Sequence, residues 1–267
     1  MANQTKTVNG IVLKELQLKE SDKVITVLTK ELGVISIYAK GAMRLKNKFH
    51  SSTGLFTYSE FVIYEGRDDK MYQLNEAVVR KVFYNLSSAV ENIALAMYMS
   101  ELVCEVVVPN EASNDILRLF LNCMYMLCEN KWSVLMTKAA FEMRLMSDVG
   151  FRPNLIGCKR CIEYDKELFL FDTEGGYLIC PDCKQSYDAN CIICEPSVTL
   201  ALRYLALADL EQMFSFKLSG LSLVRLGQIC ERYALSHTKE TYKTLDFLKP
   251  LIKPLIDTEV KNLNKGK

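Results

Sequence analysis

The chain has 267 residues, of which 49% are apolar and 24% charged, and its formal net charge at pH 7 is +1. These proportions are typical of a globular protein with room for two or three domains. Because the chain is almost neutral, any contact with nucleic acid must come from cations clustered locally. The polar start of the chain, from Met1 to Val8, has no apolar stretch of signal-peptide length, and we expect a cytoplasmic protein.

The first 80 residues predict β-structure. Five short segments rich in β-branched and aromatic residues are separated by turn residues, and they cover residues 7–13, 23–29, 33–39, 57–64 and 71–79. Five short strands leave open edges that closure into a small barrel removes. We therefore expect a five-stranded OB-fold barrel over residues 1–80, with an SH3-like barrel as the alternative.

The hydrophobic pattern changes to a helical period after the barrel. The expected helices cover residues 87–108, 115–130, 132–149, 197–208, 221–236 and 244–256, although Pro250 and Pro254 weaken the last pattern. The sequence thus predicts an α+β protein whose all-α domain has two parts, residues 81–150 and 197–267. Between them lies a cysteine-rich segment, residues 151–196.

Two cysteine pairs in that segment have the spacing of a zinc site. Cys158 and Cys161 form the first pair, Cys180 and Cys183 form the second, and eighteen residues separate the pairs. A two-residue spacer directs two sulfurs at one ion, and two such turns complete a tetrahedron. Because sulfur takes all four positions, none is left for water, and we expect one structural Zn²⁺ that holds the segment together.

Alternatives to this metal site remain open at the level of the sequence. The same cysteines can form disulfides or carry redox chemistry, and the third pair, Cys191 and Cys194, can replace either of the first two or belong to the core. Residues 151–196 carry five Lys/Arg and eight Asp/Glu, a balance of 5 − 8 = −3. This segment is therefore a poor DNA contact, and a scaffold role fits it better.

A cluster of cations follows the third expected strand. No acidic residue lies between Glu31 and Glu60, and the cations in that stretch are Lys40, Arg44, Lys46 and Lys48. Phosphate binding needs such uncompensated charges, and Tyr38, Phe49 and Phe56 offer rings for base stacking. These four cations and Tyr38 are our candidates for DNA binding; the alternative is a solvated surface loop.

The sequence offers little for catalysis. It lacks the Gly-rich phosphate loop of ATPases, and its two histidines, His50 and His237, belong to no metal or catalytic motif. We expect a protein that is not an enzyme.

The chain resembles the bacterial RecO recombination-mediator family. The resemblance rests on Gly10-Ile-Val-Leu13, on Gly33-Val-Ile-Ser-Ile-Tyr-Ala-Lys-Gly41 with Arg44, and on Gly150-Phe-Arg-Pro153, which leads into the first two cysteine pairs. It implies an OB domain, a helical domain and a zinc-type knuckle. It also implies binding of single- and double-stranded DNA and strand annealing, in a bacterial cytoplasm and close to the nucleoid.

The resemblance further implies partners. They are RecR, the C-terminal tail of single-strand-binding protein, and RecA, which the family helps to load. Lys138 and Arg144, on the third expected helix, are our candidates for partner binding. The competing hypotheses are an OB-fold interaction scaffold whose DNA affinity comes mainly from its partner, and a zinc-dependent hydrolase, which needs an open coordination position.

Overall fold

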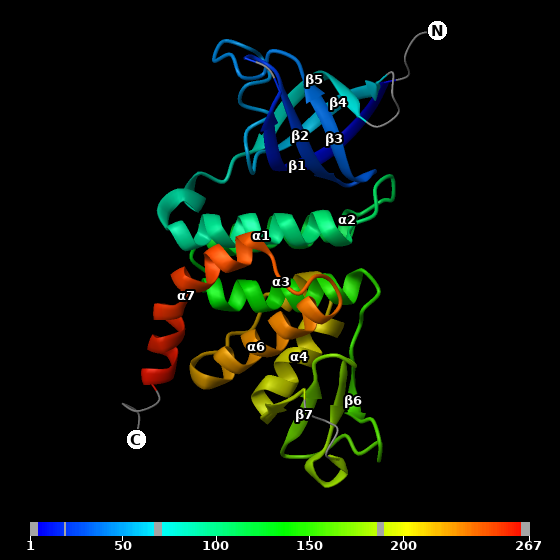
Figure 1. Ribbon diagram of the computed structural model, residues 1–267, viewed down its shortest axis with the longest axis vertical. Coiled ribbons are helices and arrows are strands. Elements are labelled where there is room, and N and C mark those ends of the chain that lie inside the picture. The colour runs from blue at the N-terminus through cyan, green and yellow to red at the C-terminus, as the bar shows by residue number, and fades with distance from the viewer. Residues whose placement is uncertain (1–4, 19, 67–70, 186–189, 263–267) are drawn as a thin grey trace. The chain divides into compact units, whose positions relative to one another are not determined.

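The computed structural model describes residues 5–18, 20–66, 71–185 and 190–262. The chain divides into two compact units (Figure 1). The barrel unit comprises residues 1–87 and 99–128, and the helical unit comprises residues 88–98 and 129–267. Among the described helices, none combines the length and apolar character needed to cross a membrane.

The N-terminal strands close into a barrel. They are β1 (Thr5–Gln17), β2 (Lys23–Thr29), β3 (Gly33–Ala39), β4 (Tyr58–Glu65) and β5 (Tyr72–Lys81), in the order β1-β2-β3-β5-β4 (Figure 1). β1 pairs antiparallel with both β2 and β4, whereas β3 and β5 are parallel. This closed five-stranded arrangement is that of an OB-fold and confirms the prediction.

The barrel core follows from the alternation of side chains along the strands. In β3 every second residue from Gly33 to Ala39 is buried, as expected when one face of a strand points inward. The core cluster also includes Phe49, which lies outside the strands in the connection from β3 to β4. A residue of this connection therefore anchors it to the barrel.

Strand β5 is only partly embedded in the barrel. Its pairing with β3 covers Ile37–Tyr72 and Tyr38–Gln73, while its pairing with β4 continues to Lys81. The β4–β5 register skips Asn75 and Arg80, which makes each a bulge. The second half of β5 is accordingly exposed in the described structure, including Val78 and Val79.

The helices follow the predicted pattern closely. They are α1 (Val90–Val106), α2 (Asn114–Cys128), α3 (Val134–Asp148), α4 (Pro196–Leu207), the short α5 (Leu210–Met213), α6 (Gly220–Ser236) and α7 (Lys243–Asn262). Helix α3 is buried on almost every side. Its first turn is capped by Ser133, whose hydroxyl accepts a hydrogen bond from the Met136 N–H.

Helix α7 is longer than the sequence pattern indicated. It continues past Pro250 and Pro254 to Asn262, whereas we expected it to end at Ile256. Both prolines are exposed, while Leu245, Leu248 and Ile252 are buried. Packing of this apolar face outweighs the hydrogen bonds that the prolines remove.

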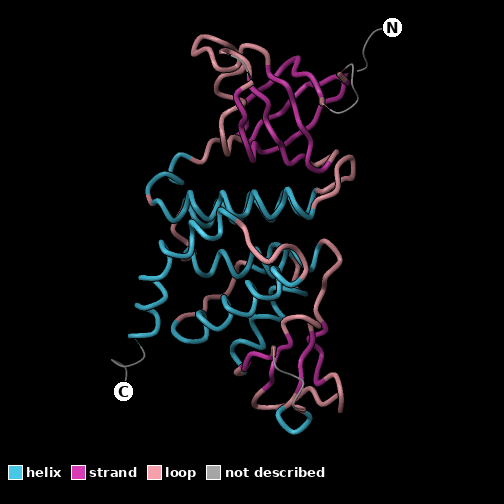
Figure 2. The backbone as a smooth tube through the Cα atoms, in the orientation of Figure 1, coloured by secondary structure: helices cyan, strands magenta, loops and turns pink. Residues whose placement is uncertain are grey.

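The cysteine segment forms a second sheet, and both sheets are drawn magenta in Figure 2. Its strands are β6 (Asn154–Cys158), β7 (Phe169–Asp172), β8 (Tyr177–Ile179) and β9 (Cys191–Cys194), in the order β6-β8-β7-β9. Strands β7 and β8 form an antiparallel hairpin, and β6 lies parallel to β8. The hairpin thus returns the second cysteine pair to the first.

Candidate metal centre and nucleic-acid interface

The four predicted cysteines come together at one end of this second sheet. The sulfurs of Cys158, Cys161, Cys180 and Cys183 all lie within 4.8 Å of one another. Cys158 ends β6, and Cys180 precedes the 3₁₀ turn η2 (Pro181–Cys183). Cys158 and Cys180 are buried, Cys183 is half-buried and Cys161 is exposed.

Tight turns fix each cysteine pair. In the first, the Cys158 N–H donates to the Glu163 carbonyl at 2.8 Å and the Ile162 N–H donates back to the Cys158 carbonyl at 2.9 Å. A Cβ on Gly157 would meet the Glu163 carbonyl oxygen at 2.7 Å, so this close return needs a glycine. In the second, the Cys183 N–H donates to the Cys180 carbonyl at 3.0 Å.

The sulfur positions fit a single tetrahedral ion. Four sulfurs at about 2.3 Å from one Zn²⁺ lie roughly 3.8 Å from each other, and the Cys161 and Cys180 sulfurs are 3.7 Å apart. All ten cysteines are free thiols, so the disulfide alternative is not realised in this structure. The four cysteines therefore lie close enough to hold a metal ion.

The surroundings favour thiolate at Cys158, whereas hydrogen bonds with the Cys180 and Cys161 thiols raise the pKa of Cys183 to about 12. Burial opposes ionisation of Cys158, but backbone N–H groups of Cys161, Cys180 and Arg160 donate to its sulfur and lower its pKa to about 6. A thiolate is the form that binds metal. The third pair does not join this cluster: Cys194 is buried in the core, and burial raises the pKa of its thiol to about 12.

The basic connection between β3 and β4, residues 40–57, is ordered by its own backbone. Successive N–H groups donate to the carbonyl three residues earlier, and the donors are Ala42, Arg44, Asn47, His50, Gly54 and Thr57. Gly41 has a positive φ of 70°, a conformation that suits glycine. The connection is therefore a compact series of turns anchored by Phe49.

This series of turns exposes the predicted cations. Lys40, Arg44, Lys46 and Lys48 are all exposed, and none forms an ion pair with a described carboxylate. Asp22 approaches the start of the connection, but its carboxylate accepts the Gly41 N–H at 2.7 Å and the Tyr38 hydroxyl. The positive charge of the connection is thus left without a described counter-ion.

The aromatic residues around these cations are placed differently from our expectation. Phe49 and Phe56 are only 8% and 6% exposed, so the hypothesis that they stack with bases is wrong. The reason is that Phe49 packs in the barrel core and Phe56 is also buried, and a buried ring is closed to a ligand. Tyr38 is half-buried, and its hydrogen bond to Asp22 raises its hydroxyl pKa.

Lys138 lies at the centre of a buried charge network in the helical unit. Its ammonium is 2.7 Å from the carboxylates of both Glu142 and Glu231, and its side chain is 4% exposed. Glu142 also accepts the Tyr98 hydroxyl at 2.8 Å, and its second oxygen is buried without a hydrogen-bond partner. Burial, partly opposed by Lys138, raises the pKa of Glu142 to about 7.

Arg144 is committed to contacts within the helical unit. Its guanidinium forms an ion pair with Asp148 at 3.0 Å and donates to the Ala208 carbonyl. The structure does not bring Arg144 into contact with Lys138, and the role of either residue in partner binding stays a prediction.

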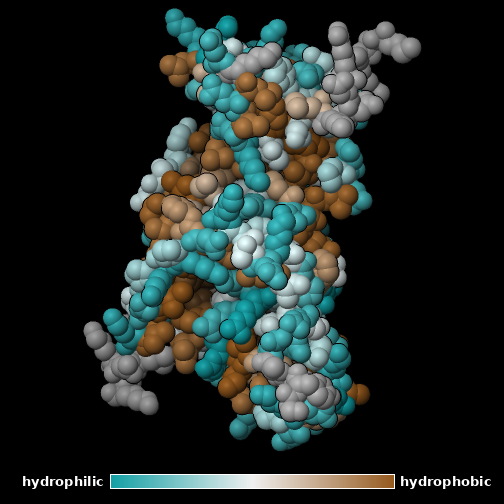
Figure 3. All heavy atoms as spheres, in the orientation of Figure 1, coloured by the Kyte–Doolittle hydropathy of each residue, from teal (hydrophilic) through white to brown (hydrophobic). Residues whose placement is uncertain are grey.

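Next to Lys138 is a groove between α3, α6 and α7 of about 300 Å³. Its lining combines apolar side chains with three lysines and with Glu231, which pairs with Lys138 and Lys249, and includes Leu135, Leu223, Val224, Ile252, Ile256 and Lys253. In the space-filling view, hydrophobic side chains lie among hydrophilic ones in the region of α6 and α7 (Figure 3). Sequence reasoning missed this groove because its walls come from three separate helices.

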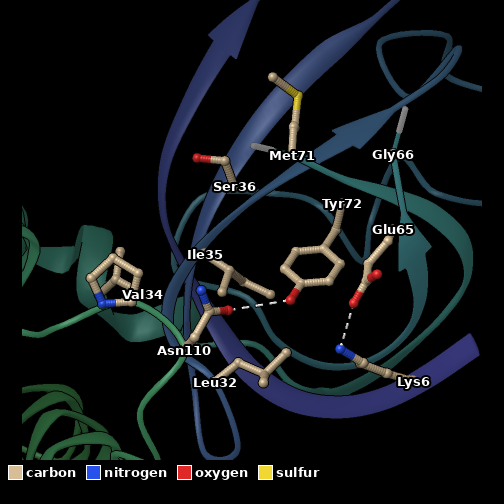
Figure 4. Close-up of a pocket in the computed structure, with 11 residues that line it drawn as sticks. Lys6, Leu32, Val34, Ile35, Ser36, Glu65, Gly66, Met71, Tyr72 and Asn110 are labelled. Carbon is tan, nitrogen blue, oxygen red and sulfur yellow. Dashed lines mark hydrogen bonds and ion pairs between the residues drawn. The ribbon is translucent and has the colours of Figure 1, made fainter. Parts of the chain in front are cut away.

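A second hollow of about 640 Å³ lies in the barrel unit, where β3 extends beyond its pairing with β5 (Figure 4). Four of its polar side chains are already engaged with each other. The Lys6 ammonium is 2.7 Å from Glu65, and the Tyr72 hydroxyl donates to Asn110 at 3.3 Å. This hollow therefore offers a ligand fewer uncommitted groups than the basic connection does.

Known proteins resemble the chain along most of its length. Residues 1–83 match the family model for the N-terminal part of recombination protein O, and residues 87–246 match the model for its C-terminal part. The chain is 35% identical over 251 residues to DNA repair protein RecO of Acetivibrio thermocellus, which covers 93% of this chain and 98% of that protein. It is 28% identical over 243 residues to the protein of the same name in Alkaliphilus metalliredigens, covering 91% and 98% of the two chains.

Proposed function

Because the chain belongs to the RecO family of DNA repair proteins, we propose that it is a non-enzymatic recombination mediator. It binds single- and double-stranded DNA, anneals complementary strands and assists RecA loading together with RecR and single-strand-binding protein. It does so in the bacterial cytoplasm, at the nucleoid. The alternative is a scaffold whose DNA affinity comes mainly from its partner.

The observation that carries this proposal is the exposed charge of the turns at residues 40–48. Lys40, Arg44, Lys46 and Lys48 lack described counter-ions on a backbone that its own hydrogen bonds hold in place. Cations that are exposed and fixed in position in this way displace condensed counter-ions from phosphates. Two strands bound on one such surface repel each other less, and this brings complementary bases together without a catalytic group.

The test is DNA binding by the isolated chain and by a variant with alanine at all four cations. We expect the variant to bind single strands more weakly. The slope of log K against log salt concentration should become less steep by roughly 3, because each of the four lost phosphate contacts accounts for about 0.7. A matched control replaces three lysines and one arginine that are exposed in the helical unit: Arg232, Lys239, Lys243 and Lys261. If the isolated wild type binds no DNA, the scaffold alternative is favoured.

We also propose that the four cysteines hold one structural Zn²⁺. The four sulfurs lie within 4.8 Å of one another and the pKa of Cys158 is lowered to about 6, and both observations support this assignment. With four thiolates the ion keeps no open position, so the hydrolase alternative has no place for its water. The ion would brace the second sheet and take no part in DNA binding.

We propose that the groove between α3, α6 and α7 binds the C-terminal tail of single-strand-binding protein. Its apolar walls fit a hydrophobic side chain, and Lys253 is exposed without a described ion pair. We expect alanine at Lys253 to weaken binding of a fluorescent peptide of that tail, and alanine at the exposed Arg232 to leave it unchanged. Equal binding by both variants and wild type would remove the groove from the proposal.

A further inference from the structure

We infer that Tyr84 is a stacking platform for an unpaired DNA base, with Lys81 as the neighbouring phosphate contact. This inference rests on the proposed DNA binding and extends it beyond the basic connection, across the exposed half of β5. The proposed ligand is an unpaired base of a single strand, which offers a flat face that a base within a duplex does not.

Tyr84 is held outward by its neighbours. It is 79% exposed, the largest fraction of any aromatic side chain in the described parts of the chain. It begins the 3₁₀ turn η1 (Tyr84–Ser88), where the Ser87 hydroxyl donates to the Tyr84 carbonyl at 3.0 Å. Phe83 and Leu86 on either side are buried, at 8% and 4% exposed. The backbone of Tyr84 is thus fixed while its ring is free to meet a ligand.

The cation beside Tyr84 is also suited to DNA. The Lys81 ammonium lies 5.2 Å from the centre of the Phe83 ring and 5.1 Å from that of Tyr125. Aromatic rings attract a cation without neutralising its charge. Lys81 therefore keeps a full positive charge three residues before Tyr84. Nonspecific single-strand sites combine such cations with stacking rings.

The exposed half of β5 connects Tyr84 to the basic connection. The Lys48 ammonium reaches the Asn75 carbonyl at 3.5 Å, and the strand continues from Asn75 to Lys81 with Val78 and Val79 exposed. Six residues of strand span about 20 Å, within the reach of the roughly 4–16 nucleotides that an OB-fold binds. A single strand can therefore run from Lys48 along β5 to Tyr84.

The test compares single- and double-stranded oligonucleotides with the full chain. We expect Tyr84→Ala to lower affinity for a single strand by about 5- to 150-fold, to leave duplex affinity near wild type, and to keep the salt slope unchanged because no cation is lost. Tyr84→Phe retains the ring and should bind as wild type. Lys81→Ala should lower the salt slope by about 0.7.

Tyr164 provides the matched control. It is 68% exposed and lies between two exposed acids, Glu163 and Asp165, so Tyr164→Ala should leave single-strand affinity unchanged. Tyr84→Trp adds a spectroscopic readout, because its fluorescence should be quenched when oligo(dT) stacks on it, while the buried Trp132 gives a constant background.

Two outcomes would overturn the inference and leave the proposed function intact. In the first, Tyr84→Ala binds single strands as tightly as wild type does. In the second, Tyr84→Ala binds single strands and duplexes more weakly by the same factor. In both cases the quadruple alanine variant of the basic connection would still bind DNA more weakly than wild type. A wild-type chain that binds no oligonucleotide would overturn the inference and the proposed function together.

Discussion

The basic connection of the barrel unit and the Lys138 network of the helical unit use charged groups in opposite ways. In the barrel unit the cations at residues 40–48 face solvent and lack described counter-ions. In the helical unit Lys138 is enclosed by Glu142 and Glu231, and the cysteine sulfurs converge on one point. The charge at residues 40–48 stays available to a ligand, whereas the charge of Lys138 is compensated within the fold.

This difference shows that residue type alone does not identify a binding cation. Lys46 and Lys138 are the same amino acid, and both were candidates for contacts with a ligand. Their surroundings decide what removal costs: an exposed charge is solvated by water, whereas a buried charge depends on its partner. Each of the following experiments tests this contrast.

The largest effect is expected at the cysteine cluster. Replacing Cys158 and Cys180 with serine should reduce bound metal from one ion per chain to almost none and unfold the second sheet, because structural zinc contributes on the order of 10 kcal/mol to such segments. Metal analysis and hydrogen exchange over residues 154–183 would measure this. Cys191→Ser, outside the cluster, is the control. Unchanged exchange in the metal-free double variant would contradict the bracing role.

The next effect is expected at Lys138. Lys138→Ala leaves Glu142 buried without its cation, and breaking a buried pair in this way costs about 3–5 kcal/mol. Urea unfolding would show a lower midpoint. The matched control, Lys46→Ala on the basic connection, should stay within about 0.5 kcal/mol of wild type. Equal losses in the two variants would remove the contrast between the units.

Glu142 gives the contrast a pH dependence. The pKa of the Glu142 carboxyl is about 7 in the folded chain, and its ordinary value is 4.5. Between these two pH values the folded chain therefore binds one proton more than the unfolded chain. The resulting stability is present below pH 4.5 and is lost as pH rises through 7. Relative to Glu142→Gln, wild type should lose roughly 3 kcal/mol between pH 4.5 and pH 8, at about 1.4 kcal/mol per pKa unit. Parallel stability profiles of the two proteins would rule this out.

The smallest effect is expected at Gly41. A Cβ there meets the Asn47 side-chain nitrogen at 2.8 Å and its φ is 70°, so Gly41→Ala should cost about 1–2 kcal/mol and weaken DNA binding by disturbing the turns. Gly227→Ala is the control, because a Cβ on this helical glycine meets nothing within 4 Å and should stabilise by about 0.5–1 kcal/mol. If Gly41→Ala and Gly227→Ala changed the free energy of unfolding in the same direction, this prediction would be wrong.

Much of the fold could be predicted from local patterns. Strands β2 and β3 occupy the residues that their β-branched alternation indicated, and the approach of the first two cysteine pairs followed from their spacing. These features depend on residues close in sequence. The length of α7 was not predicted, because packing of its apolar face overrides the two prolines.

The candidate sites were predictable only in part. The cysteine cluster follows from a motif, and the exposure of Lys46 from a stretch without acids. The pairing of Lys138 with Glu231 joins residues 93 positions apart, and no local pattern indicates it. The same holds for Phe49, whose burial depends on the barrel that it closes, and for Tyr84, whose exposure depends on the burial of Phe83.

The separation of Lys138 from Glu231 also bears on how the protein is made. The barrel strands are contiguous, from Thr5 to Lys81, and can pair as soon as they leave the ribosome, since domains generally form as units during translation. The centre of the helical unit has to wait for Glu231, a delay of about 5–20 s at 5–20 residues per second. Throughout that interval Lys138 has only Glu142, four residues on in the same helix, as a counter-ion, and the second of its two ion pairs is missing.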